Sequence, residues 1–491
     1  MPGPIHLLVL SPVLVLAFGA CVLLLSEAFL KSGDRRYQSV FAAACALLAL
    51  AGCAVQLARA PLTGPILRQA ARGDPFQALV TAVVCAGLFL AVLLSASYLK
   101  RTEAERGEYY ALMLFAASGM SLLAMSDALV MIFISLEVMS LAVYALCAWL
   151  RRTQRSTEAA FKYFLLGAFS SAIFLYGAAL AYGATGSTHL SDIAAGASGR
   201  HPELLGPALA LLAAGFAFKV AAVPFHMWAP DVYEGAPTPV TAFMAVGVKA
   251  AAFAALFRTL VVAFHASPDK WGPVVGALAI LTMVVGNLVA LPQRNVKRML
   301  AYSAIAHAGY LLVAVSAAAS PAARELGGQA MLFYLLAYTV TAAGAFGMAA
   351  AIERKDDESP AAWDLDRFAG LSRRRPVLAA FMASFLISLA GVPPTAGFMG
   401  KLLVFRAALD AGQVGLAIVG VLTSAVAAYY YLRVVVYMYF RPPEPEVAQE
   451  PRMPALDFSL GLACALVFVL GLAPGRLVDL AEVGARFLFV R

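Results

Sequence analysis

The chain has 491 residues, of which 62% are hydrophobic and only 13% are charged. A soluble globular domain carries about 25% charged residues, so this composition excludes an ordinary soluble protein. The net charge of +8 could suggest a nucleic-acid partner. The lysines and arginines instead lie mostly in short loops between apolar runs, where such residues set membrane topology, and nothing else in the chain indicates nucleic-acid binding.

Apolar runs near 20 residues recur along the whole chain, and each is long enough to cross a bilayer. The first, which begins at His6, has no positive residue before it and no clear cleavage site, so we interpret it as a retained helix and not a signal peptide. The pattern predicts an all-α polytopic membrane protein of about fourteen transmembrane helices. The expected spans are 5–30, 37–58, 75–99, 109–126, 127–150, 158–184, 203–225, 238–265, 272–292, 296–319, 327–352, 376–409, 412–440 and 455–474.

Basic residues alternate between rich and poor loops along these spans. The rich loops hold Lys31, Arg35, Arg36, Lys100, Arg101, Arg106, Arg151, Arg152, Arg155, Arg294, Lys297, Arg298, Arg354, Lys355, Arg367, Arg373, Arg374 and Arg375. The poor side holds Arg59, Arg68, Arg72, Arg200, Lys270, Arg324, Arg476, Arg486 and Arg491. The rich side is expected to be cytoplasmic, which places both termini on the opposite, periplasmic side of a bacterial inner membrane.

Two of the expected helices contain prolines that interrupt them. Pro224 should break the seventh, because it removes a backbone donor and clashes with the carbonyl of Val220. Pro393 and Pro394 should break the twelfth, beside Gly391 and Gly397. A pair of interrupted helices in corresponding places is typical of inverted repeats with a site at the breaks. We therefore predict a three-helix N-terminal segment (1–108), one repeat of helices four to eight (109–265), an inverted repeat of helices nine to thirteen (271–441), and a last helix with a tail (442–491).

Five ionisable residues lie well inside expected spans: Glu137, Lys219, Lys249, His307 and Lys401. A charged side chain at a helix centre costs about 2.5–3.5 kcal/mol on insertion scales, and such residues commonly form proton relays. The set therefore predicts a proton path. A sodium path, a solute transporter and a membrane scaffold are the alternatives, but the sequences at the breaks are small and apolar and offer little for binding a solute.

Two further residues are weaker candidates for the path. Lys162, near the start of its helix, fits a lysine that reaches the membrane surface equally well, and His226 at the first break fits a structural hydrogen bond. The six cysteines show no Cys-x-x-Cys spacing and no accompanying histidines, so we expect no metal, haem or iron–sulfur site.

Three stretches carry a family resemblance: "KVAAVPFHMWAPDVYEGAPTPVTAFM", "LAYSAIAHAGYLL" and "SLAGVPPTAGFMGKLLVF". They resemble the antiporter-like N subunits of proton-pumping NADH:quinone oxidoreductase, respiratory complex I. The resemblance extends over nearly the whole chain, and the segment "PDVYEGAPTP" is its most specific part. Subunits of multi-subunit sodium/proton antiporters share the lysines and are the alternative family.

The resemblance implies a role for each buried residue. It implies that Glu137 pairs with Lys219, that Lys219 is the gated proton carrier, and that Lys249 passes the proton along a central axis. It implies that His307 bridges the two halves and that Lys401 is the terminal carrier.

The resemblance also implies that Lys162 assists near Lys219 and that this chain binds no cofactor. NADH, FMN, iron–sulfur clusters and quinone would be bound by other subunits of the complex. The implied partners are neighbouring antiporter-like subunits, small membrane subunits, the lipid bilayer and protons.

Overall fold

The computed structural model describes residues 4–29, 36–59, 64–151, 153–196, 201–353, 360–442 and 453–489. Within these residues, thirteen helices are long and apolar enough to cross a membrane, which confirms the expected all-α polytopic class. The expected span 376–409 forms two shorter helices of 15 residues each. Some of the loop residues used to predict the topology lie outside the described ranges: Lys31, Arg35, Arg152, Arg200, Arg354, Lys355 and Arg491.

Among the described residues, the first half of the chain forms eleven α-helices. They are α1 (Pro4–Phe29), α2 (Arg36–Ala58), α3 (Pro75–Arg101), α4 (Gly107–Met125), α5 (Leu129–Cys147), α6 (Gln154–Thr185), α7 (Leu190–Ala195), α8 (Leu205–Lys219), α9 (Trp228–Gly235), α10 (Thr238–Phe243) and α11 (Lys249–Arg258). A π-helical turn, Met244–Val248, joins α10 to α11, and a second, Thr259–Ala263, follows α11. These segments therefore form one continuous span, Thr238–Ala263.

The part of the second half that the structure describes forms nine α-helices. They are α12 (Pro268–Ala290), α13 (Val296–Ala317), α14 (Arg324–Ile352), α15 (Leu371–Arg374), α16 (Pro376–Ala390), α17 (Ala396–Asp410), α18 (Val414–Phe440), α19 (Pro454–Leu472) and α20 (Gly475–Arg486). The sequence patterns did not predict α20. They also did not predict a small antiparallel hairpin of β1 (Gly64–Ile66) and β2 (Ala71–Gly73) between α2 and α3.

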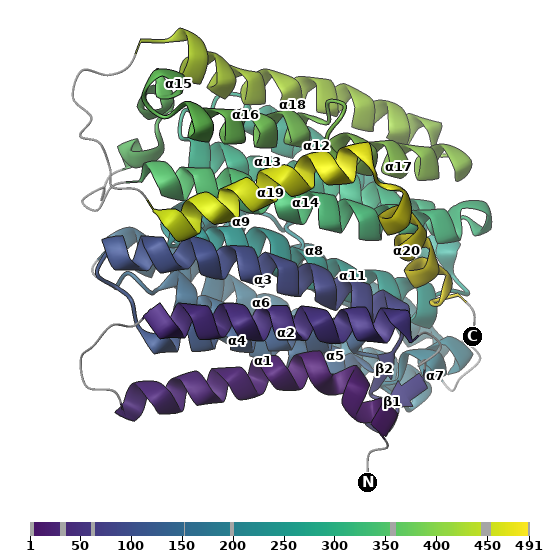
Figure 1. Ribbon diagram of the computed structural model, residues 1–491. Coiled ribbons are helices and arrows are strands. Elements are labelled where there is room, and N and C mark those ends of the chain that lie inside the picture. The colour runs from purple at the N-terminus through teal and green to yellow at the C-terminus, as the bar shows by residue number, and fades with distance from the viewer. Residues whose placement is uncertain are drawn as a thin grey trace.

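The long helices lie side by side, with α1 along one edge of the molecule and α18 along the other (Figure 1). Helix α19 lies midway between these two edges and packs on α3 and α14. The start of α1 and the C-terminal α20 lie at the same end of the helices in Figure 1. The span containing α11 is wholly buried, and α13 and α14 are nearly so. Each of these apolar spans would face lipid if it stood alone in the membrane. In this protein the three spans instead form the centre.

The first break follows α8, whose last residue stands five positions before Pro224. The amide of Ala221 donates to the carbonyl of Phe218 (3.1 Å), and the amide of Ala222 donates to that of Ala217 (2.8 Å). With Ala221 in the left-handed region at a φ of +58°, this is a Schellman helix end. The predicted interruption of the seventh span is confirmed, but Pro224 does not itself end the helix. The left-handed residue ends it earlier, and the proline only keeps the chain from resuming a helix before it.

The second break has the same geometry. Gly391, at a φ of +85°, donates to the carbonyl of Ser388 (2.9 Å), and Val392 donates to that of Ile387 (3.2 Å). Gly397 then allows α17 to lie against α16, because a Cβ there would stand 1.8 Å from the carbonyl oxygen of Ser388. The predicted interruption of the twelfth span is confirmed.

The two breaks occupy equivalent places in a repeated order of elements. Ala221 precedes Pro224 by three residues, and Gly391 precedes Pro394 by the same number. Helices α4, α5 and α6 come before the first broken pair, and α12, α13 and α14 come before the second. One long span follows each pair. The two five-helix repeats and the inverted relation between them stay predictions.

Candidate functional site

Lys219 is the last residue of α8 and is only 3% exposed. Its ammonium donates to Ser140 Oγ (2.9 Å) and to the hydroxyl of Tyr144 (3.4 Å), both on α5. The rings of Tyr144, Tyr163 and Phe218 lie within 6 Å of the ammonium nitrogen. A helix C-terminus favours a cation, so the break and the aromatic rings together provide a site for a buried charge.

Glu137 lies one helical turn before Ser140 on the same helix. Its carboxylate accepts a hydrogen bond from Ser171 Oγ of α6 (2.6 Å) and is only partly buried. No ion pair in the described part of the chain joins Glu137 to Lys219. The pairing of these two residues therefore stays a prediction, with Ser140, a partner of Lys219, one turn after Glu137 on α5.

Lys249 and His307 lie at the centre of the protein, where both are 3% exposed. The Lys249 ammonium donates to the carbonyl of Ala304, one turn before His307 on α13. It also lies 4.6 Å from the centre of the Tyr338 ring. The imidazole is held at both nitrogens, by the hydroxyl of Tyr334 at Nδ1 (2.7 Å) and by that of Tyr431 at Nε2 (3.3 Å).

Lys401, on α17, is 4% exposed and completes the second helix break. Its ammonium donates to the carbonyls of Leu389 (2.9 Å) and Ala390 (3.0 Å) and to Ser424 Oγ of α18 (2.7 Å). The two carbonyls are at the end of α16, where they have no partner within the helix. The ammonium of Lys401, on α17, therefore caps the C-terminal end of α16.

A small cavity connects the surroundings of His307 and Lys401. Its volume is about 10 Å³, and its wall includes His307, Thr341 and Leu389. Such a cavity holds about one water molecule if polar groups face it. Thr341 Oγ1 and Ser388 Oγ lie 3.1 Å apart in the same wall, and Leu389 is one of the carbonyl partners of Lys401. The cavity therefore lies between His307 and the carbonyl of Leu389 that accepts from Lys401.

The structure groups the predicted residues unequally. Lys249, His307 and Lys401 are connected through Ala304, the tyrosine hydroxyls and the small cavity. Lys219 and Glu137 form a separate group on α5 and α8, and no hydrogen bond between described residues joins that group to Lys249. The central histidine therefore lies near Lys249 of the first predicted repeat and near the small cavity beside Lys401 of the second.

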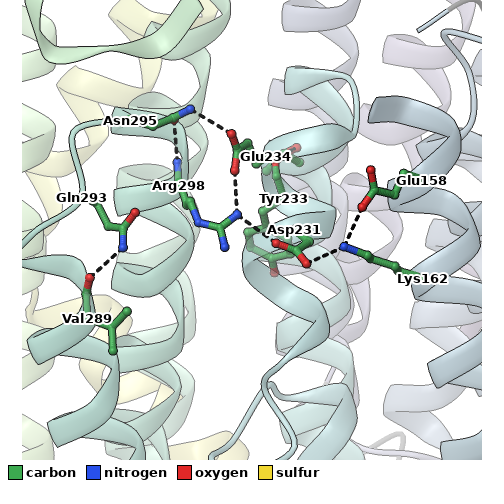
Figure 2. A network of polar contacts seen from close by, with 10 residues as sticks. Glu158, Lys162, Asp231, Tyr233, Glu234, Val289, Gln293, Asn295 and Arg298 are labelled. Atoms are coloured by element: carbon green, nitrogen blue, oxygen red, sulfur yellow. Dashed lines mark hydrogen bonds and ion pairs between the residues drawn. The ribbon is translucent and has the colours of Figure 1, made fainter. Parts of the chain in front are cut away.

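Lys162 lies away from the path, in a network of charges shown in Figure 2. Its ammonium bonds to Glu158 (2.7 Å) and to Asp231 of α9 (2.8 Å). Asp231 also bonds to Arg298 (2.9 Å), which bonds in turn to Glu234 (2.7 Å). The two acids belong to the motif "PDVYEG", so this motif joins α6 to α13 across the short α9.

The weaker candidate His226 lies in the first break, between α8 and α9. Its ring is partly buried, and its Nδ1 is buried without a hydrogen-bond partner among the described residues. No hydrogen bond or ion pair among the described residues joins it to Lys219. The structural hydrogen bond suggested for His226 therefore stays a prediction.

Replacing Asp231 with asparagine is expected to reduce stability by less than about 1 kcal/mol, because pairs this exposed contribute little. Burial acts to raise the pKa of Asp231, but the hydrogen bonds from Lys162 and Arg298 outweigh burial and hold that pKa below its usual value. A carboxylate with a lowered pKa stabilises the fold above about pH 4 and loses this contribution as pH falls further. Thermal unfolding of wild type and variant at pH 7 and near pH 3 checks both points. A loss at pH 7 of several kcal/mol, or one that persists unchanged at low pH, would contradict this interpretation.

Several buried polar residues were missed by the sequence analysis. Tyr334 and Tyr338 are one turn apart on α14 and contact His307 and Lys249. Arg258, inside the apolar stretch "LFRTL", forms a buried pair with Asp74. Lys297 was counted as a loop residue but is 1% exposed and donates to the carbonyl of Ala236 (2.7 Å). Arg258 could have been singled out, because a charge inside an apolar run is visible in the sequence. The roles of the tyrosines could not, because they depend on which helices pack together.

Comparison with known proteins shows the family of this chain. The family described as NADH:quinone oxidoreductase/Mrp antiporter, transmembrane, matches residues 126–427. A protein of Myxococcus xanthus named NADH-quinone oxidoreductase subunit N is 52% identical over 96% of both chains. The chain belongs to this family. A second relative, NADH-quinone oxidoreductase subunit N 1 of Sorangium cellulosum, is 46% identical over 96% of this chain and 97% of that one.

Solved structures of family members have the same fold. A chain of respiratory complex I from Thermus thermophilus with bound aureothin is 38% identical, with a TM-score of 0.80 over 96% of this chain and 99% of that chain. A chain of the Mrp complex from Dietzia sp. DQ12-45-1b has a TM-score of 0.87 over 100% of this chain and 98% of that chain, but at 23% identity it shows the shared fold alone.

Proposed function

We propose that this chain is a proton-translocating membrane subunit of NADH:quinone oxidoreductase, of the N type. The observation that supports it most is the buried line from Lys249 through His307 and the small cavity to Lys401. Its groups are lysine, histidine and tyrosine, all able to give and accept protons, and they are enclosed by apolar helices. The relatives that support the assignment are named as N subunits of this oxidoreductase. The antiporter alternative rests on the shared family model and on a likeness of fold.

In the proposed mechanism, Lys219 is the gated carrier of the first half. A change in the charge or position of Glu137 alters the stability of the ammonium that Ser140 and Tyr144 hold. The proton then passes to Lys249, crosses at His307 and leaves from Lys401. No hydrogen bond links Lys219 to Lys249 among the described residues, so this step requires water or a movement of the first break.

Glu137 is the proposed receiver of the coupling signal. It is only partly buried, and the neighbouring positions Ile134, Val138 and Leu141 on α5 are exposed. A carboxylate is costly to expose to lipid, so another membrane subunit is the expected cover of this face. A rearrangement in that neighbour would act on Glu137 first and on Lys219 through it.

The electron-transfer chemistry is proposed to lie in other subunits, which would bind NADH, FMN, iron–sulfur clusters and quinone. The described residues contain no group of three or more His, Cys, Asp or Glu side chains suited to a metal ion. Neighbouring antiporter-like subunits, small membrane subunits and the bilayer are the proposed partners. We place the chain in a bacterial inner membrane with both termini on the periplasmic side.

The proposed architecture keeps four parts: 1–108, the repeat 109–265, the inverted repeat 271–441, and 442–491. The recurrence of the break supports the two repeats. Glu137 of α5 and His307 of α13 also stand 170 residues apart, the same interval as Ala221 and Gly391. The inverted relation would place one half-path on each side of the membrane, with His307 near their junction.

Replacing Gly391 with alanine is expected to reduce pumping severalfold. The added Cβ would lie 2.7 Å from Cδ of Lys401, which pushes the ammonium off its carbonyl partners, and the left-handed backbone adds about 1–2 kcal/mol of strain. Gly412→Ala is the matched control, because its φ is +76° but an added Cβ there meets no atom within 4 Å. Proton uptake per NADH oxidised is the measurement. Equal effects of the two variants would show that strain alone is responsible, and not displacement of Lys401.

The proposal is tested by purifying the tagged chain under mild detergent from its own host. An assembly that contains flavin and iron–sulfur clusters and reduces quinone with NADH is the expected result. Purification without these groups, together with exchange of sodium for an imposed pH gradient in vesicles, would instead establish the antiporter.

A further inference from the structure

An apolar groove lies between α8 and α12, outside the proton path. Its volume is about 210 Å³, and its wall includes Leu209 and Ala213 of α8 and Val274 and Leu278 of α12. Of the residues that form its wall, Lys270 alone is charged. An apolar cavity of comparable size, about 150 Å³, stays dry and binds hydrocarbon. The groove is therefore suited to an apolar chain and not to water.

The length of the groove matches one leaflet of a bilayer. Its wall extends along α8 from Gly206, near the start of the helix, to Val220, just past its end. At 1.5 Å per residue these positions are separated by about 20 Å. The hydrocarbon core of a bilayer is about 30 Å thick, so one leaflet contributes about 15 Å. The groove thus extends from the membrane surface to about its middle.

A free cation lies at the surface end of the groove. Lys270 is exposed, in the first turn of α12, and no ion pair or hydrogen bond of its side chain occurs among the described residues. The neighbouring Trp271 donates its indole N–H to the carbonyl of Phe264 (3.1 Å), so its ring contributes only apolar surface to the wall. A basic residue at headgroup depth attracts an anionic lipid by about 1 kcal/mol, or roughly fivefold.

We propose that this groove binds one acyl chain of an anionic phospholipid, with the phosphate beside Lys270. A transmembrane helix from a partner, at 10–12 Å across, would lie over the groove without filling it. The inner end of the groove is walled by Val220 and Ala222, one and three residues after Lys219 at the first break. A bound acyl chain would therefore cover this break from the lipid side.

The test uses membranes that contain the whole assembly and a phosphatidylglycerol with a photoactivatable group in its acyl chain. Cross-links to peptides of α8 and α12 are then mapped by mass spectrometry. Labelling of the groove is expected in wild type, and Ala213→Phe, which fills the groove, should remove most of it. Ala277→Phe is the matched control, because Ala277 is exposed on α12 but does not contribute to the groove. Gly206→Phe is a second blocking variant, since a Cβ there meets no atom within 4 Å and folding should be preserved.

The headgroup is tested separately with Lys270→Gln. This variant should lose roughly fivefold in preference for phosphatidylglycerol over a zwitterionic phosphatidylcholine probe, while total labelling of the groove remains. Labelling that both blocking variants leave unchanged would overturn the acyl-chain site, as would cross-linking of this surface to a neighbouring subunit in place of lipid. An unchanged headgroup preference in Lys270→Gln would overturn the role of Lys270.

Discussion

Replacing Lys219 with methionine is expected to reduce proton uptake per NADH oxidised by more than about tenfold, since a positioned proton-transfer group typically contributes 10²–10⁴-fold. Methionine has a similar length and no charge, so it fills the same space beside Tyr144, Tyr163 and Phe218. It cannot carry a proton. Assembly should therefore survive while translocation fails, and proton uptake and NADH oxidation can be followed in the same vesicles.

Lys100→Met is the matched control for this variant. Lys100 is also a lysine at a helix end, in the last turn of α3, but it is exposed. Its replacement should leave uptake unchanged. Wild-type uptake in Lys219→Met would show that the lysine is structural, and loss of the whole assembly would show that its charge is needed for folding.

Replacing Asp74 with alanine is expected to destabilise the protein by about 3–5 kcal/mol, the usual cost of removing one partner of a buried ion pair. Asp74 bonds to Arg258 at 2.7 and 2.9 Å through both carboxylate oxygens, and both side chains are almost inaccessible. Its Oδ1 also accepts the amide of Gln77 and caps α3 (2.8 Å). The variant therefore leaves a charge unpaired between α3 and α11 and also removes a cap. Thermal inactivation and the yield of assembled complex are the measurements.

Two further variants show whether the unpaired charge is the cause. In Asp74→Ala with Arg258→Met no uncompensated charge remains, so part of the stability should return. Glu482→Ala removes an exposed pair with Arg486 and should cost only about 0.3–0.5 kcal/mol. If the double variant were less stable than Asp74→Ala, packing and not charge would explain the loss.

The sequence predicted the spans well because their signal is local. An apolar run of about 20 residues has few other interpretations, and the observed α13 and α18 lie within two residues of their expected limits. The end of α8 at Lys219 was harder to predict from the sequence. Proline is visible in a sequence, but the left-handed conformation of Ala221 that ends α8 is not, because alanine gives no sign of it.

The candidate site was predictable in its charges and not in its connections. Lysines inside apolar runs are conspicuous, so Lys249 and Lys401 could be named. Lys249 donates to one backbone carbonyl, and Lys401 donates to two carbonyls and to Ser424 Oγ. These partners come from helices far apart in the chain. Lys297 shows the opposite case. It looked like a loop charge, yet it is buried 4.3 Å from the ring centre of Trp363, a contact that no local pattern indicates.

The most direct test of the central claim is NADH-driven acidification of inverted membrane vesicles, with and without sodium. Vesicles from cells that lack this chain are compared with vesicles that carry wild type or Lys219→Met. Sodium-independent acidification that requires the wild-type chain and is lost in the variant is the predicted result. Acidification that persists without the chain, or that the variant supports fully, would contradict the account.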